Sequence, residues 1–237
     1  MNHIIVCRKE FEMATIVLLR HAHSIANKSG ILAGRKPGID LSEIGRAESE
    51  KLASRLSGID FNHIYLSPLE RCSQTIDPLL KSKEASRIQT LTLDDRVIEM
   101  DYGKWSGRKL SSLSREKLWR EIQANPSKVT FPEGESFKAM RKRAMNLVDE
   151  ILAKKGSANH LIVSHGDVIK VITSSLLGMK LDNFQSLTID PASITVFRGN
   201  SESARMVAFN DTESQLSSII GVATKKKMAL GGGSGKR

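Results

Sequence analysis

Short apolar runs alternate along this chain with longer segments in which apolar residues recur at helical spacing. Runs of five or six residues rich in aliphatic side chains are typical of buried strands. Four such runs lie at residues 15–19, 63–67, 88–93 and 160–164. Two segments near the C-terminus, "SITVF" and "ARMVAF", predict a closing pair of strands.

Five segments between these runs are predicted to be helical. The first follows Ser42, a residue type that favours the N-cap. Pro68 suits the first position of the second helix, and Pro78 predicts a break or kink in it. A short helix is predicted from about residue 110 to residue 122, and the last helix ends at Gly178. The longest helix presents one apolar face: Phe137, Met140, Ala144, Leu147, Val148 and Ile151.

Strands that alternate with helices predict an α/β fold. We expect a three-layer sandwich with a mostly parallel central sheet and helices on both faces. A chain of 237 residues suits one well-packed domain, and we place that domain at residues 14–222. Residues 1–13 are interpreted as an N-terminal extension. Residues 223–237 are basic and rich in Gly and Ser, which predicts a disordered tail.

Composition excludes several classes of protein. No run of about 18 apolar residues is present, so a membrane span is not expected. Cys7 and Cys72 are the only cysteines, and their separation fits neither a disulfide framework nor a metal site. We therefore predict a cytoplasmic protein.

The formal net charge is +10, which raises the question of nucleic-acid binding. Five of the positive charges lie in the last thirteen residues, "KKKMALGGGSGKR". The rest of the chain has no alternation of aromatic and basic residues of the kind that forms a stacking platform. Nucleic acid is thus not expected as the main ligand.

Candidate chemistry gathers where the predicted strands end. Arg20 and His21 follow the first strand directly, and His165 follows the strand at 160–164. Arg71 lies in the first turns of the helix after the second strand, and Glu99 follows the third. Because ligands of open α/β sheets bind beyond the carboxyl ends of the strands, these side chains are predicted to face one crevice.

Such a set favours an anion over a metal ion. Two guanidinium groups repel a cation, and their planar donors match phosphate oxygens. The helix that begins at Gly166 adds backbone N–H groups and the positive end of its dipole. An imidazole in this setting is a nucleophile towards phosphorus, and a carboxyl group can protonate the leaving oxygen. The residues predict phosphoryl transfer through a phosphohistidine, with no metal or cofactor.

Taken singly, each of these residues has an ordinary explanation. Arg20-His21 could form a surface turn, His165 could be a hydrogen-bonded core residue, and Glu99 could be a surface carboxylate. Only their order and spacing together favour a catalytic site.

Four motifs in order make the sequence recognisable. They are "RHAHSIAN" at residues 20–27, "SPLERCSQT" at 67–75, "EMDYGKWSG" at 99–107 and "SHG" at 164–166. With them the chain resembles the histidine phosphatase superfamily, also called phosphoglycerate mutase-like, over residues 14–210. The resemblance departs from the family pattern at Ala22, where Gly is usual. If that position needed a positive φ angle, the change would cause strain.

The resemblance implies a role for each site residue. His21 would become phosphorylated, and Glu99 would protonate the leaving oxygen and then deprotonate the attacking water. His23 receives no catalytic role, and Asp101 is the nearest alternative to Glu99. The phosphoryl oxygens would be held by Arg20, Arg71 and His165, and the phosphate pocket completed by Asn27, Ser24 and Gly166.

Within the superfamily, the segment "VIEMDYGKWSG" lacks the Arg-His pair typical of phosphoglycerate mutases. This favours a broad-specificity phosphatase acting on a small phosphorylated metabolite. The stretch "VSHGDVIKVI" resembles a bacterial branch. A phosphoglycerate or sugar-phosphate mutase and a phosphate-binding protein without turnover stay as alternatives. A homodimer is left open.

Overall fold

The fold is built on a single six-stranded sheet with the order β3-β2-β4-β1-β5-β6. In the computed structural model, which describes residues 13–225, the first four strands in sequence run parallel to one another. Strand β5 runs antiparallel to β1, and β6 antiparallel to β5. The strands are β1 (Ala14–Arg20), β2 (His63–Leu66), β3 (Leu91–Leu93), β4 (Asn159–Ser164), β5 (Ile194–Gly199) and β6 (Ala204–Asp211).

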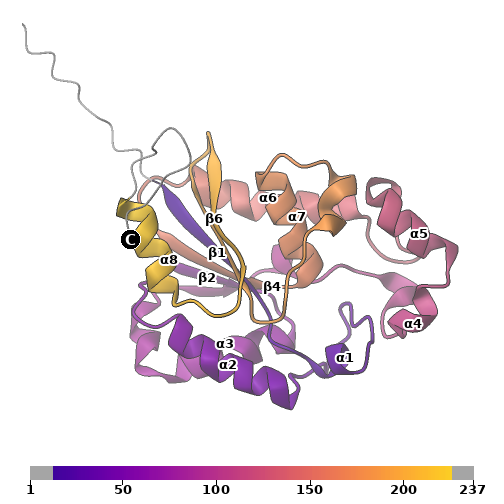
Figure 1. Ribbon diagram of the computed structural model, residues 1–237, viewed down its shortest axis with the longest axis horizontal. Coiled ribbons are helices and arrows are strands. Elements are labelled where there is room, and N and C mark those ends of the chain that lie inside the picture. Colours follow the sequence, from indigo (N-terminus) through magenta and orange to yellow (C-terminus); the bar gives the residue numbers. More distant parts are fainter. Residues whose placement is uncertain (1–12, 226–237) are drawn as a thin grey trace, which may run out of the picture.

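Helices cover both faces of the sheet, which confirms the predicted three-layer sandwich (Figure 1). Alternate side chains of β1 serve the two layers, as the pleat requires. Ile16 and Leu18 pack in the core beneath α6 (Phe137–Ala153) and α7 (Gly166–Leu176), whereas Val17 and Leu19 pack in the core beneath α2 (Glu43–Arg55) and α3 (Glu70–Lys81). The helices are α1 (Ile25–Lys28), α2 (Glu43–Arg55), α3 (Glu70–Lys81), α4 (Leu110–Leu113), α5 (Lys117–Ala124), α6 (Phe137–Ala153), α7 (Gly166–Leu176) and α8 (Leu216–Lys225).

The register of the central strands sets where the site forms. Arg20 on β1 lies opposite Ser164 on β4, and Leu66 on β2 lies opposite Val163. The three parallel strands therefore end level with one another. The residues that follow them emerge at one edge of the sheet.

The helix does not break at Pro78, because α3 runs through this residue to Lys81. Proline lacks the N–H that would bond the carbonyl of Gln74. The hydroxyl of Ser49, on α2, donates to that carbonyl instead, at 3.0 Å. A side chain distant in sequence thus satisfies the helix.

Other boundaries also differ from prediction. The third strand is limited to Leu91–Leu93, although residues 88–93 carry the apolar pattern. The helix predicted at 110–122 is two short helices, α4 and α5, interrupted at residues 114–116.

The C-terminal helix α8 was not predicted. It includes residues 223–225, which we had assigned to the tail, and Leu216, Ile219 and Ile220 pack on the α2–α3 side of the core. The remainder of the tail and residues 1–12 lie outside the described residues. Within the part described, no helix is long and apolar enough to cross a membrane.

Candidate active site

Strands β1 and β4 bring the two motif histidines together. The N–H of His21 donates to the carbonyl of Ser164 at 2.9 Å, so the chain continues the strand pairing one step past Arg20. The rings of His21 and His165 then lie with their centroids 5.2 Å apart. The structure thus brings the two predicted histidines close together.

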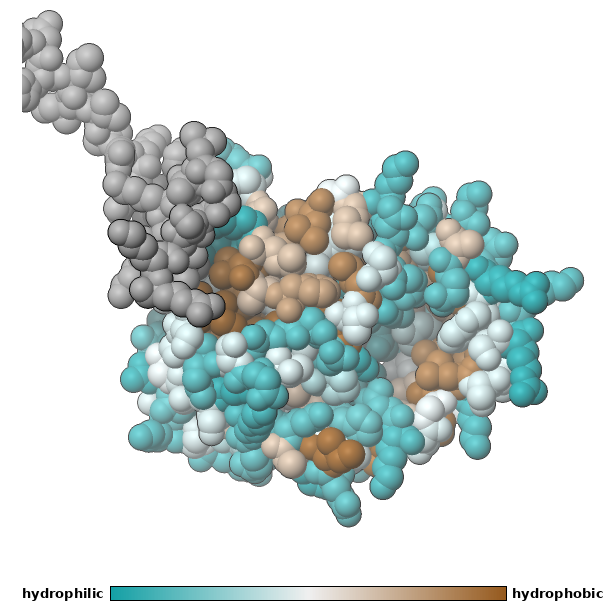
Figure 2. Space-filling model, in the orientation of Figure 1, coloured by the Kyte–Doolittle hydropathy of each residue, from teal (hydrophilic) through white to brown (hydrophobic). Residues whose placement is uncertain are grey.

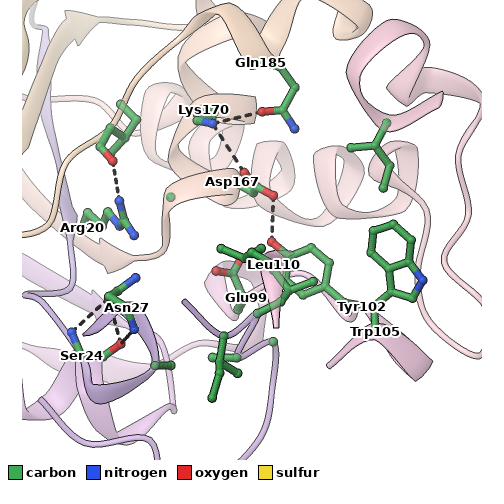
Figure 3. A pocket seen from close by; sticks show the side chains of 18 of the residues that line it. Arg20, Ser24, Asn27, Glu99, Tyr102, Trp105, Leu110, Asp167, Lys170 and Gln185 are labelled. Atoms are coloured by element: carbon green, nitrogen blue, oxygen red, sulfur yellow. Dashed lines mark hydrogen bonds and ion pairs between the residues drawn. The ribbon is translucent and has the colours of Figure 1, made fainter. Parts of the chain in front are cut away.

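A cavity of about 500 Å³ opens at this edge of the sheet. Figure 3 shows Arg20, Asn27, Glu99 and Asp167 around it. His165 is fully buried, and its imidazole contacts Arg71, which lines the cavity. The other seven predicted site residues line the cavity: Arg20, His21, Ser24, Asn27, Arg71, Glu99 and Gly166.

The imidazole of His21 is oriented by the backbone carbonyl of the next residue. Its Nδ1 lies 2.8 Å from the carbonyl oxygen of Ala22. A carbonyl only accepts, so Nδ1 carries the hydrogen and Nε2 keeps its lone pair. Burial, followed by the charges of Arg71 and Arg20, lowers the pKa of His21 well below its usual range. The ring is therefore neutral and nucleophilic at neutral pH.

Two guanidinium groups act on this ring, that of the buried Arg71 and that of the half-buried Arg20. The NH2 of Arg71 donates to the carbonyl of Gly34 at 3.0 Å, and Arg20 donates through NH1 to the carbonyl of Ile189. Among residues 13–225, the Nε and NH1 of Arg71 and the Nε of Arg20 have no partner. Buried polar groups are nearly always paired, and an unpaired charged donor is costly. These nitrogens indicate a site for an anion.

Glu99 is a carboxyl group suited to exchange protons near neutral pH. Its Oε1 accepts from the N–H of Met100 at 2.8 Å, and its Oε2 lies 3.9 Å from Nδ1 of His165. Burial raises the pKa of Glu99 to about 7, and the charge of Asp167 acts in the same direction, whereas Arg71 opposes it.

The backbone of Glu99 is held by a network of charged side chains that the sequence does not predict. The carbonyl oxygen of Glu99 accepts from Arg35 at 2.8 Å and from Arg143 at 3.1 Å. Both arginines also bind Oε1 of Glu135, at 2.9 and 2.7 Å. Asp101, the alternative acid, lies outside the set of described residues that line the cavity. The only available signal was Glu135 within "PEGES", just before the longest helix.

Ser24 and Asn27 form a capping box at α1. The Oδ1 of Asn27 accepts from the N–H of Ser24 at 3.0 Å and from its hydroxyl at 2.8 Å. These bonds fix the amide orientation, and Nδ2 is left as the donor available to the cavity. Gly166 begins α7, and a Cβ atom at this position would lie 3.5 Å from the guanidinium carbon of Arg20.

The comparisons with known proteins agree with this geometry. The model of the histidine phosphatase superfamily (branch 1) matches residues 16–212. The chain belongs to this family. It is 32% identical over 189 residues to phosphoserine phosphatase 1 of Hydrogenobacter thermophilus, covering 78% of this chain and 86% of that one.

Further relatives extend the same family. A 2,3-bisphosphoglycerate-dependent phosphoglycerate mutase of Thermoplasma acidophilum is 29% identical over 184 residues, covering 78% of this chain and 86% of that protein. The structure of YhfR from Bacillus stearothermophilus superposes with a TM-score of 0.75 at 23% identity, over 84% of this chain and 97% of that one. The resemblance to the histidine phosphatase superfamily and the fold predicted from sequence are confirmed.

The departure at Ala22 causes no backbone strain in this histidine phosphatase. Ala22, which lies within the described residues, does not have a positive φ angle. Its N–H donates to the hydroxyl of Thr75 at 2.9 Å, and its methyl group packs against Leu41 and Ala192. The site accommodates the extra methyl as part of the core.

We expect Ala22→Gly to leave kcat/KM within about twofold and to lower the free energy of unfolding by about 1 kcal/mol, because it adds backbone freedom and removes a packed methyl group. Urea unfolding and steady-state kinetics check both parts. A rise in activity of tenfold or more would mean that Ala22 obstructs the phosphate site.

The outer end of the cavity contains a polar strip that sequence reasoning did not assign. Figure 3 shows the strip running along α7 from Tyr102 to Gln185. The hydroxyl of Tyr102 donates to Asp167 at 2.8 Å. Lys170 lies 3.8 Å from Asp167 and donates to Gln185 at 3.1 Å. The sequence shows Asp167 and Lys170 near each other, but no sequence pattern predicts their contacts with residues 102 and 185.

Proposed function

We propose that the protein is a metal-independent phosphomonoesterase that works through a phosphohistidine on Nε2 of His21. Nε2 attacks phosphorus while the bond to the leaving oxygen breaks, and Glu99 gives its proton to that oxygen. The resulting carboxylate takes a proton from water as the water attacks phosphorus. Phosphate leaves, His21 is again neutral, and Glu99 is again protonated.

One observation carries this proposal. Donors of Arg20 and Arg71, buried and without partners among the described residues, surround a neutral imidazole whose Nε2 keeps its lone pair. A phosphoryl group at Nε2 would receive those donors, which would offset the negative charge that spreads over its oxygens in the transition state. Asn27 Nδ2 and the N-terminus of α7 at Gly166 would supply further donors, with Ser24 holding Asn27 in place.

His165 would act beside the nucleophile as a donor. Burial lowers its pKa well below the usual range, so it is neutral. Its Nδ1 lies 3.2 Å from NH2 of Arg71, and its Nε2 lies 2.7 Å from the hydroxyl of Ser67. A guanidinium only donates, so in this geometry Nδ1 accepts from Arg71 and Nε2 carries the hydrogen that is donated to Ser67. His165 would donate to a phosphoryl oxygen through Nδ1 in its other tautomer, with Arg71 turned from Nδ1 to the phosphate.

Glu99 makes the rate depend on pH. With an alkyl phosphate, kcat/KM is expected to fall about tenfold per pH unit above about 7, because Glu99 loses the proton that the leaving oxygen needs. The lowered pKa of His21 keeps the nucleophile neutral on the acid side. A pH profile of kcat/KM measures this.

The matched variant for this profile is Glu99→Gln. It is expected to remove the fall above pH 7 and to lower kcat/KM near pH 6 by about 10²-fold or more. A wild-type profile that rises through pH 7, or a Gln variant with the same fall, would exclude Glu99 as the acid.

One panel of substrates tests the proposed function. Phenyl phosphate, sugar phosphates and phosphoglycerates are incubated with the wild type and with His21→Ala, with and without a chelator. We expect phosphate release that the chelator does not affect and that the variant loses. Isomerisation without release would indicate a mutase, and neither reaction a binding protein. Loss of activity with the chelator would contradict metal independence.

A cytoplasmic location stays a prediction of the sequence, and a homodimer stays open.

A further inference from the structure

The cavity continues beyond the phosphate site into a region with one apolar wall. This wall comes from the loop after α1 and from α4, α5 and the segment before β5, and it consists of Leu32, Leu110, Trp119, Ile122 and Leu187. Trp119 stacks on the buried Trp105, with ring centroids 6.3 Å apart, which holds its indole in place. In Figure 2 the visible face is hollowed, and hydrophobic residues border the recess.

The charges of this outer region do not favour an anion. Apart from Arg20 and Arg71, the charged residues that line the cavity are Glu99, Asp167, Lys170 and Asp190. Lys170 is thus the only cation among them, and it is already engaged by Asp167 and Gln185. A carboxylate on the leaving group would meet two aspartates and no unengaged cation within the described lining.

The apolar wall and the charge balance together indicate a substrate class. We infer that the leaving group is an uncharged alcohol with an apolar body, and that this body packs on the wall formed by Leu110 and Trp119. The inference rests on the proposed phosphomonoesterase function. A substrate of this class has the phosphate as its only anionic group.

A matched pair of substrates tests the charge preference. Phenyl phosphate and 4-carboxyphenyl phosphate have the same ring and differ by one carboxylate. The carboxylate makes the phenolate a slightly better leaving group, so chemistry alone favours the second ester. We expect kcat/KM to be at least about tenfold lower for 4-carboxyphenyl phosphate. Equal or faster turnover of that ester, lost in Lys170→Ala, would overturn the inference.

A matched pair of variants tests the apolar wall. Leu110 and Leu177 are both leucines at helix ends, 38% and 42% exposed, but only Leu110 lines the cavity. Leu110→Ala is expected to lower the ratio of kcat/KM for phenyl phosphate to that for ethyl phosphate by about threefold to tenfold, since it removes apolar contact area. Leu177→Ala should leave this ratio unchanged. An unchanged ratio in Leu110→Ala, or an equal drop in Leu177→Ala, would exclude the wall.

Different results would contradict the proposed function and the substrate class. If neither ester releases phosphate, or if release survives in His21→Ala, the proposed function is wrong. If release depends on His21 but the carboxylated ester is preferred, the function stands and the substrate class is wrong.

Discussion

His21→Ala is expected to abolish phosphate release from phenyl phosphate, with kcat/KM falling by about 10⁴-fold or more. The variant removes the nitrogen that we propose as the nucleophile, and alanine offers no replacement. His21 is neutral in the folded protein, so the change leaves the charge of the site as it was. Colorimetric phosphate release at pH 6.5 measures the effect.

His23→Ala is the matched control for this variant. His23 lies two residues further along and bonds the hydroxyl of Ser42 through Nδ1 at 2.8 Å, and the structure places it outside the cavity lining. We expect its activity to stay within about threefold of wild type. Activity that survives in His21→Ala would contradict the mechanism, and equal losses in both variants would mean that the loss does not report on the nucleophile.

Arg71→Met is expected to lower kcat/KM by about 10³-fold, because it removes charge and two donors aimed at the phosphoryl oxygens. It should also reduce the stabilisation by inorganic phosphate. A ligand that binds only the native state raises the unfolding temperature, and the rise grows with the logarithm of its affinity. Thermal unfolding with and without 10 mM phosphate therefore measures binding without turnover.

Arg46→Met provides the comparison, since Arg46 is an exposed arginine on α2 outside the cavity. This variant should keep the phosphate-induced shift of the wild type. If Arg71→Met shows the same shift and an unchanged kcat/KM, the unpaired nitrogens of Arg71 do not form the anion site.

The sequence was sufficient to predict the centre of the site. His21 and His165 each follow a short apolar run directly, and parallel strands end on the same edge of a sheet. Their convergence follows from those two facts alone. The residue roles needed the family resemblance, because an Arg-His pair or a single Glu has several ordinary explanations.

The surroundings of the site could not be predicted, because they depend on contacts between residues distant in sequence. Arg35, Glu135 and Arg143 meet behind Glu99, yet no periodicity links their positions. The same reason explains why the helix does not break at Pro78, where Ser49 of another helix donates to the carbonyl of Gln74.

Short-range patterns leave other features open. Ser24 stays a predicted residue of the phosphate pocket: it lines the cavity, and its hydroxyl also caps α1. The helix at 110–122 has a continuous helical pattern and is nonetheless interrupted before α5. Local propensity does not specify where tertiary packing ends a helix.

The central claim, a phosphohistidine at His21, is tested most directly by trapping the intermediate. The enzyme is mixed with ³²P-labelled phenyl phosphate, quenched in alkali within milliseconds and digested with trypsin. Cleavage after Arg20 and Lys28 gives a peptide of residues 21–28, which also contains His23. The His23→Ala variant therefore separates the two positions.

If His21 is the nucleophile, alkali-stable and acid-labile label is expected in this peptide for the wild type and for His23→Ala, and no label for His21→Ala. Label on His23, His165 or Glu99, or turnover with no labelled protein at any quench time, would contradict the central claim.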